Sequence, residues 1–256
     1  MTSLRRTEST ERLTYRLNRR RKVVVVIRSA LVASGIATAG LLGCGLQAGG
    51  ASASTGNLDL EFGEAAGATV AIDSSGHHHN GSIGAGVDVG SGYAHFPLRS
   101  KYTSLGARPL VLVPDAADGS LDPGNKPFSV KIRFLTHYGE NLVQKGQATT
   151  SGGQFKMQID KGKMTCIVHT SAGTASAGSG KLGLSDGAWH TAKCVRSASS
   201  VKLYVDGKLT DYSTHATGTL DNAYPWSIGG KSHCNGQPVE CDYFHGRIDY
   251  VRFTKG

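Results

Sequence analysis

The sequence predicts an all-β protein whose strands form a two-sheet antiparallel sandwich, and three observations support this fold class. Glycine is abundant, with 35 residues in 256, and apolar residues rarely recur at helical spacing. Short segments of alternating apolar and polar residues recur instead, with turn residues between them. About 203 residues follow an N-terminal leader, a length that suits one all-β domain.

The first 53 residues have the three parts of an export signal. A basic stretch ends at residues 19–22, an apolar stretch follows over residues 23–46, and the small residues 51–53 suit cleavage. We therefore predict a leader over residues 1–53 and a domain over residues 54–256. The domain is expected to be secreted.

The leader also allows a lipid anchor. The segment Leu-Leu-Gly-Cys that ends at Cys44 resembles a lipobox, which would attach the protein to the outer face of a membrane. Arg28 interrupts the apolar stretch, so a permanent transmembrane helix is the least favoured alternative. Cys44 is thus the only membrane contact that the sequence suggests.

The formal net charge of +9 is concentrated in the leader. Nine of the 28 basic residues precede Val32, and from Ser54 onward 19 Lys and Arg oppose 17 Asp and Glu. The domain itself therefore carries a formal charge of only +2. A nucleic-acid partner loses its main support.

The strongest local pattern is a hairpin over residues 187–209. Side chains alternate between the two faces of a strand along Trp189–Arg196, and we place Trp189 on the core face. A second alternating strand covers Val201–Val205, and Asp206-Gly207 suits the type I′ turn of a two-residue hairpin loop. The other predicted strands are residues 58–62, 94–96, 111–114, 128–137, 154–159, 164–170, 226–229 and 247–253. Residues 172–180 are small and polar and predict a surface loop.

Four segments, taken in order, resemble laminin G-like domains of the concanavalin A-like lectin/glucanase superfamily. They are the D-S-S-G-x-x-x-N-G motif within residues 62–83, residues 114–134, the hairpin with its L-Y-V-D-G string, and residues 228–253. This resemblance implies a two-sheet jelly roll whose rim loops carry calcium and ligands.

Four cysteines follow the leader, and export favours disulfides between them. They allow three pairings, of which sequence proximity favours Cys166–Cys194 and Cys234–Cys241. A zinc site is the alternative, but no C-x-x-C spacing supports it.

Calcium is the one cofactor that the sequence suggests, in a structural role. Asp73 and Asn80 offer the oxygen ligands that calcium prefers. By resemblance, Asp249 on the last strand completes the site. The alternative is that Asp73 only forms an Asx turn. The three consecutive histidines 77–79 predict a polar loop, because successive side chains alternate in direction.

Catalytic patterns are missing from the sequence. The domain has four glutamates and no E-x-D-x-x-E, G-x-S-x-G or H-E-x-x-H motif. His190 is interpreted as structural. The sequence therefore predicts a non-catalytic module that binds a glycan or an extracellular protein surface. A glycan-active enzyme on the same scaffold and a structural envelope protein remain alternatives.

Three aromatic residues are candidates for stacking on sugar rings: Tyr204, Trp226 and Tyr243. The predicted binding face includes the rim loops at residues 73–82 and 233–243. Both loops combine polar side chains with glycine, which suits exposed recognition segments.

Overall fold

Strands with one buried and one solvent-exposed face form the two layers of the domain. The computed structural model describes residues 56–98, 108–180, 183–215, 217–233 and 241–256. Within these ranges the chain forms strands and no helix. The described residues therefore contain no helix that could cross a membrane. The predicted leader, with Cys44, lies outside the described residues.

The first layer is a seven-stranded sheet. Its spatial order is β1 (Leu58–Leu60), β15 (Gly246–Lys255), β6 (Phe128–Leu135), β11 (Trp189–Arg196), β12 (Val201–Val205) and β13 (Lys208–Ser213). The remaining strand, β4 (Ala94–Phe96), pairs with the beginning of β15. Each neighbouring pair is antiparallel.

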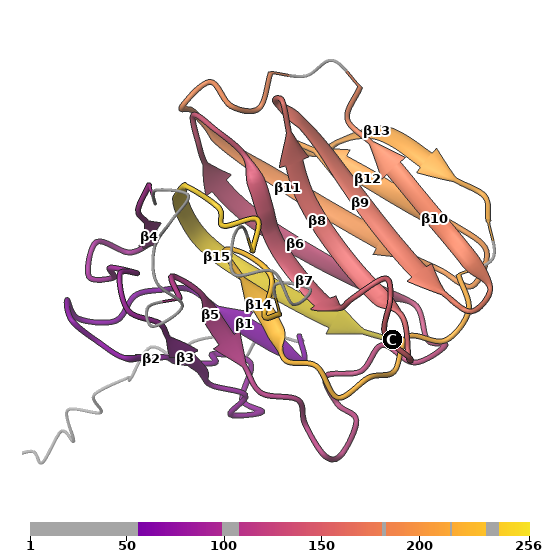
Figure 1. Cartoon of the computed structure of the whole chain (residues 1–256), viewed down its shortest axis with the longest axis horizontal. Coiled ribbons are helices and arrows are strands. Elements are labelled where there is room, and N and C mark those ends of the chain that lie inside the picture. The colour runs from indigo at the N-terminus through magenta and orange to yellow at the C-terminus, as the bar shows by residue number, and fades with distance from the viewer. Residues whose placement is uncertain (1–55, 99–107, 181–182, 216, 234–240) are drawn as a thin grey trace, which may run out of the picture. The chain divides into compact units, whose positions relative to one another are not determined.

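The second layer is an eight-stranded sheet that lies over the first (Figure 1). Its order is β10 (Gly173–Gly178), β9 (Lys163–Thr170), β8 (Gln154–Asp160), β7 (Glu140–Gly146), β14 (Trp226–Ile228), β5 (Val111–Val113), β3 (Gly81–Ile83) and β2 (Val70–Ala71). These pairs are also antiparallel, so the predicted two-sheet sandwich is confirmed.

The core lies between the sheets. On β6 the residues Phe128, Val130, Ile132 and Phe134 are buried and alternate with half-exposed residues, as the sequence predicts. The ring of Phe128 lies 5.4 Å from that of Phe155 on the facing sheet. Packing of such apolar faces against each other is the main stabilising contribution of a sandwich.

The predicted hairpin at residues 187–209 is confirmed, and the predicted strands 154–159 and 164–170 pair as a second hairpin. Asp206 and Gly207 have φ of 49° and 78°, which is the left-handed conformation that a type I′ turn requires at both central positions. β8 and β9 form the second hairpin, and Asp160 pairs with Lys163 across its two turn residues.

The core position of Trp189 is a wrong prediction. The buried residues of β11 are Ala192, Cys194 and Arg196, which have the opposite parity along the strand. Trp189 instead lies half-buried on the outer face, beside Tyr93. The disulfide of Cys194 and the burial of Arg196 decide which face of this strand turns inward.

Arg196 is a cation in the core that the alternating pattern did not reveal. Its side chain is fully buried, and its guanidinium donates hydrogen bonds to the carbonyl oxygens of Lys126, Gly124 and Gly218. Burial lowers the pKa of Arg196. The guanidinium of this β11 residue thereby links two connecting loops to the sheet, since it supplies hydrogen-bond donors to their carbonyl oxygens.

The predicted loop at residues 172–180 is also wrong, since it contains β10. Ala175 and Ala177 face inward and are buried, while the residues between them are exposed. The amide of Gly178 donates to the carboxylate of Asp211 on β13 of the other sheet, at 2.8 Å. Small side chains suit this position because the edges of the two sheets approach each other here.

The Cys166–Cys194 disulfide is confirmed. Sequence proximity favoured this pair, but β9 and β11 belong to different sheets. The bond therefore crosses the core, with the two Cα atoms 6.1 Å apart. Cys241 is also disulfide-bonded, but Cys234 lies outside the described residues, so that pairing stays a prediction.

Candidate functional site

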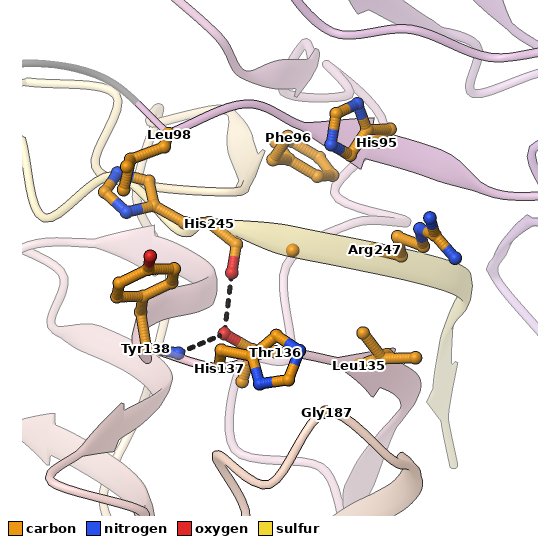
Figure 2. Close-up of a pocket in the computed structure, with 11 residues that line it drawn as sticks. His95, Phe96, Leu98, Leu135, Thr136, His137, Tyr138, Gly187, His245 and Arg247 are labelled. Atoms are coloured by element: carbon orange, nitrogen blue, oxygen red, sulfur yellow. Dashed lines mark hydrogen bonds between the residues drawn. The ribbon is translucent and has the colours of Figure 1, made fainter. Parts of the chain in front are cut away.

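A cavity of about 370 Å³ opens where β4, β15 and β6 meet. Figure 2 shows His95 and Arg247 toward one end and Tyr138, Leu98 and His245 toward the other. Its full lining consists of His95, Phe96, Leu98, Leu135, Thr136, His137, Tyr138, Gly187, His245, Gly246 and Arg247. The wall thus combines apolar and aromatic groups with one guanidinium and three imidazoles.

Strand register brings these residues together from distant parts of the sequence. Arg247 on β15 stands opposite His95 on one side and Leu135 on the other. In the next segment, the hydroxyl of Thr136 donates to the carbonyl oxygen of His245 at 2.6 Å and accepts from the amide of Tyr138 at 2.9 Å (Figure 2). This hydroxyl therefore fixes the chain on both sides of the cavity.

Gly187 allows the loop before β11 to close against the cavity. Its amide donates to the carbonyl of Thr136 at 2.9 Å. Its φ is 78°, and a Cβ at this position would lie 2.1 Å from the ring of His137. A side chain here would both strain the backbone and displace the imidazole.

The outer rim of the cavity is aromatic and exposed. Tyr138 and Leu98 are 58% and 64% exposed, and the Tyr138 ring lies edge-on to His245 with the centroids 5.7 Å apart. Burial lowers the pKa of His245. This imidazole is therefore neutral at neutral pH and can both donate and accept a hydrogen bond.

A second cavity, of about 180 Å³, also borders Arg247 and His95. It is lined by Asp88, Val89, Ser91, Tyr93, His95 and Arg247. Since His95 and Arg247 belong to both linings, we treat the two cavities as one groove. We call it the Arg247 groove.

Stacked cations and rings continue from the Arg247 groove across the outer sheet face. The guanidinium of Arg247 lies 4.9 Å from the Tyr93 ring centroid, and the ring of Tyr93 lies 6.0 Å from that of Trp189. The guanidinium of Arg133 covers Trp189 at 4.7 Å. These contacts hold the aromatic faces in place and contribute cation–π attraction.

His190 joins two acidic residues near the groove. Its Nδ1 lies 2.9 Å from Asp206 and its Nε2 lies 3.1 Å from Asp186. Burial alone would lower the pKa of His190, but its hydrogen bonds to Asp206 and Asp186 outweigh this effect and raise it. The imidazole therefore fastens the loop that carries Gly187, which agrees with a structural role.

The residues predicted to bind calcium have other contacts. The Asp73 carboxylate accepts hydrogen bonds from the amides of Asp59, Ser75 and His79 and from the Ser75 hydroxyl, while Asn80 accepts from the Asp73 amide. Burial alone would raise the pKa of Asp73, but these hydrogen bonds lower it.

Asp249 contacts a cation, since its carboxylate lies 2.5 Å from the Arg133 guanidinium. The described residues contain no cluster of three or more metal-ligating side chains. The Asp73 carboxylate thus accepts four hydrogen bonds, and the Asp249 carboxylate is paired with Arg133. The Asx-turn alternative describes Asp73 well, and calcium binding stays a prediction.

The predicted stacking residues lie in three different places. Trp226 cannot stack on a ligand, because it is fully buried with its ring 4.8 Å from Phe253 and its indole N–H donating to the Leu121 carbonyl. Tyr204 is half-buried on the outer face of β12, opposite Lys193. Tyr243 is half-buried beside β7, where it bridges to Asn141.

The Arg247 groove was not predicted from the sequence. Its residues come from four segments, the first near His95 and the last near Arg247, more than half the chain apart. No spacing rule links them. The only local signal was a histidine next to an aromatic residue at His95-Phe96, His137-Tyr138 and Phe244-His245.

Parts of this chain are similar in sequence to known proteins. Sex hormone-binding globulin of Phodopus sungorus is 26% identical over 150 residues, which are 58% of this chain and 36% of that protein. Domains LG4-5 of the mouse laminin alpha1 chain are 25% identical with a TM-score of 0.44, over 52% of this chain and 38% of that one. This chain therefore matches little more than a third of each.

An enzyme shares the scaffold as well. A sialidase of Trypanosoma rangeli has a TM-score of 0.50 and 16% identity, over 77% of this chain and 30% of that one. Identity at this level shows the fold alone. The scaffold by itself therefore does not distinguish a binding protein from an enzyme.

A family model decides the membership. The Laminin_G_3 model, described as the concanavalin A-like lectin/glucanases superfamily, matches residues 118–256. The match covers more than half of the chain and includes strands of both sheets. The chain therefore belongs to the laminin G-like family of the concanavalin A-like lectin/glucanases superfamily.

Proposed function

We propose that this protein is an exported, non-catalytic binding module that recognises a carbohydrate in the Arg247 groove. The observation that carries the proposal is the mixed wall of that groove. Exposed and half-exposed rings of Tyr138 and Tyr93 stand beside guanidinium, imidazole and hydroxyl groups. Sugars present apolar ring faces and hydroxyls together, so they need both kinds of contact.

The groove offers binding groups but no matched pair of carboxylates. Glycoside hydrolysis ordinarily uses two carboxyl groups on either side of the scissile bond. Asp88 is the one carboxylate among the described residues that line the groove. Of the glutamates, Glu61 pairs with Arg252 and Glu64 accepts from the Ile72 amide. This arrangement favours binding over turnover.

Export is supported by the disulfide across the core. Cys166 and Cys194 form it between two buried strands, and such structural disulfides persist in oxidising compartments. The ligand is accordingly expected on a cell surface or in an extracellular matrix. A glycan attached to an extracellular protein would meet the same requirement.

A glycan array on the purified protein tests the proposal. Tyr93→Ala and Tyr138→Ala are each expected to weaken binding on the order of tenfold, because each removes a ring face from the groove. Tyr212→Ala is the matched control, since Tyr212 is 59% exposed on β13 and lines neither cavity. Its affinity should equal that of the wild type.

Two results would contradict the proposal. Binding that survives both groove substitutions places the site elsewhere, for example on the sheet face around Tyr204. Turnover of a polysaccharide that depends on a single carboxylate, such as Asp88, would identify an enzyme instead.

A further inference from the structure

We infer that the Arg247 groove recognises an anionic group on its sugar, with Arg247 as the anion-binding residue. This inference rests on the proposed function and narrows its ligand class to acidic saccharides. The expected group is a carboxylate, and a sulfate ester shares the chemistry.

Arg247 differs from the other arginines of the described chain. Each of the other four donates to oxygen atoms: Arg108 to the Ser232 carbonyl, Arg133 to Asp249, Arg196 to three carbonyls and Arg252 to Asp59 and Glu61. Arg247 is exposed, and among the described residues its side chain interacts with the Tyr93 ring alone. All five of its N–H donors therefore remain for a ligand or for water.

The Tyr93 ring holds the guanidinium plane without using its donors. The guanidinium carbon lies over the ring, 4.9 Å from its centroid, and a cation–π contact leaves the N–H donors available for hydrogen bonds. A carboxylate matches these donors with two parallel hydrogen bonds. A restrained guanidinium loses less side-chain entropy on binding than a free one.

The wall of the larger cavity has no negative charge to oppose an anion. Among the described residues, it contains Arg247, three histidines and no aspartate or glutamate. The imidazoles and the Thr136 hydroxyl add polar groups, but none of them repels a carboxylate as an acid would. The residues that line this cavity therefore favour an anion over a cation, and Asp88 of the adjoining cavity is the one acid among the described residues of the groove.

The smaller cavity complements this selection. Its one acid, Asp88, stands 3.8 Å from His95 and beside Ser91. A carboxylate and a hydroxyl at such a position suit the neutral hydroxyls of a sugar ring as hydrogen-bond partners. An acidic sugar presents both features, an anion at one carbon and hydroxyls at the others.

Three matched saccharide pairs would test the inference by isothermal titration calorimetry on the full chain. The first pair is a trigalacturonate and a trigalactoside, which differ in their carboxylates. The second pair is a sulfated and a plain dextran oligomer, which differ in their sulfates. The third pair is the trigalacturonate and its methyl ester, in which esterification removes the charge alone. The wild type is expected to bind an acidic member at least about tenfold more tightly than its neutral counterpart. The relative affinities of the two acidic probes identify the group.

Arg247→Gln and Lys193→Gln are the matched variants, because each removes one positive charge from the same outer sheet face. Lys193 is exposed on β11 and lines neither cavity. Arg247→Gln is expected to weaken acidic-probe binding by about 10- to 100-fold. Lys193→Gln should change it by less than about threefold, and both variants should remain folded with a cooperative thermal transition.

The outcomes separate the two proposals. Equal binding of acidic and neutral probes, unchanged by Arg247→Gln, would overturn the anion inference and leave carbohydrate binding standing. Equal losses in both variants would also overturn it, because they would show a diffuse charge effect. Failure of every saccharide to bind would overturn the proposed function itself.

Discussion

Cys166 on β9 and Cys194 on β11 form a disulfide that joins the two sheets through the core. Their sequence separation is 28 residues, so the bond closes a sizeable loop in the unfolded chain. Replacing both cysteines by alanine is expected to lower the free energy of unfolding by about 3 to 4 kcal/mol. Urea denaturation of the oxidised wild type and the double variant measures this difference.

The predicted Cys234–Cys241 bond provides the comparison. It closes a shorter loop, so its removal should cost only about 2 to 3 kcal/mol. Non-reducing peptide mapping should recover both pairs separately. Crossed pairs, or a larger loss on removing the second bond, would contradict this assignment.

His190 is expected to make stability depend on pH. Its folded pKa is raised above the usual 6.5, so its contribution is fully present below about pH 6.5 and is lost as pH rises through the folded pKa. The melting-temperature difference between wild type and His190→Gln should therefore be largest near pH 5 to 6 and shrink in alkaline buffer.

The acidic partners of His190 set the lower limit of the pH range in which this interaction stabilises the fold. The Ala188 amide, followed by His190, lowers the pKa of Asp186. Burial alone would raise the pKa of Asp206, but the Thr191 amide and His190 lower it. Their contribution is present above about pH 3.9 and is lost as pH falls through the lowered pKa values. A difference that grows steadily from pH 6 to pH 9 would refute this assignment.

Trp226 is expected to affect stability rather than ligand contact. Its indole fills the space between Phe155 and Phe253, and its N–H is satisfied by the Leu121 carbonyl. Trp226→Ala should lower the free energy of unfolding by about 3 to 5 kcal/mol, because it leaves a cavity. Tyr204→Ala, on the outer face, should cost far less. A Trp226→Phe variant that stays folded but loses glycan affinity would restore the stacking role.

Asp73 is expected to stabilise its loop without a metal. Four donors satisfy its carboxylate, so Asp73→Ala should cost about 2 to 3 kcal/mol in calcium-free buffer, because buried donors lose their acceptor. Differential scanning calorimetry with chelator and with excess calcium measures the effect. A wild-type melting temperature that falls with chelator and recovers with calcium would establish the calcium site instead.

Local sequence signals predicted most of the strands. Apolar and polar residues alternate along β6, because one face of this strand is buried and the other is exposed to solvent. Asp206-Gly207 predicted the β12–β13 hairpin, because few residue pairs adopt positive φ at both turn positions. The pairing of Cys166 with Cys194 also followed from sequence, although their placement in opposite sheets did not.

Only the tertiary structure decided which face of a strand turns inward and which distant residues meet. Trp189 and Ala192 both suit a core position, and the sequence of β11 does not choose between the two parities; the disulfide and the Arg196 anchor do. The Arg247 groove likewise depends on register between β4, β15 and β6. Register is a non-local property, set by the fit of whole sheet faces, so no local pattern records it.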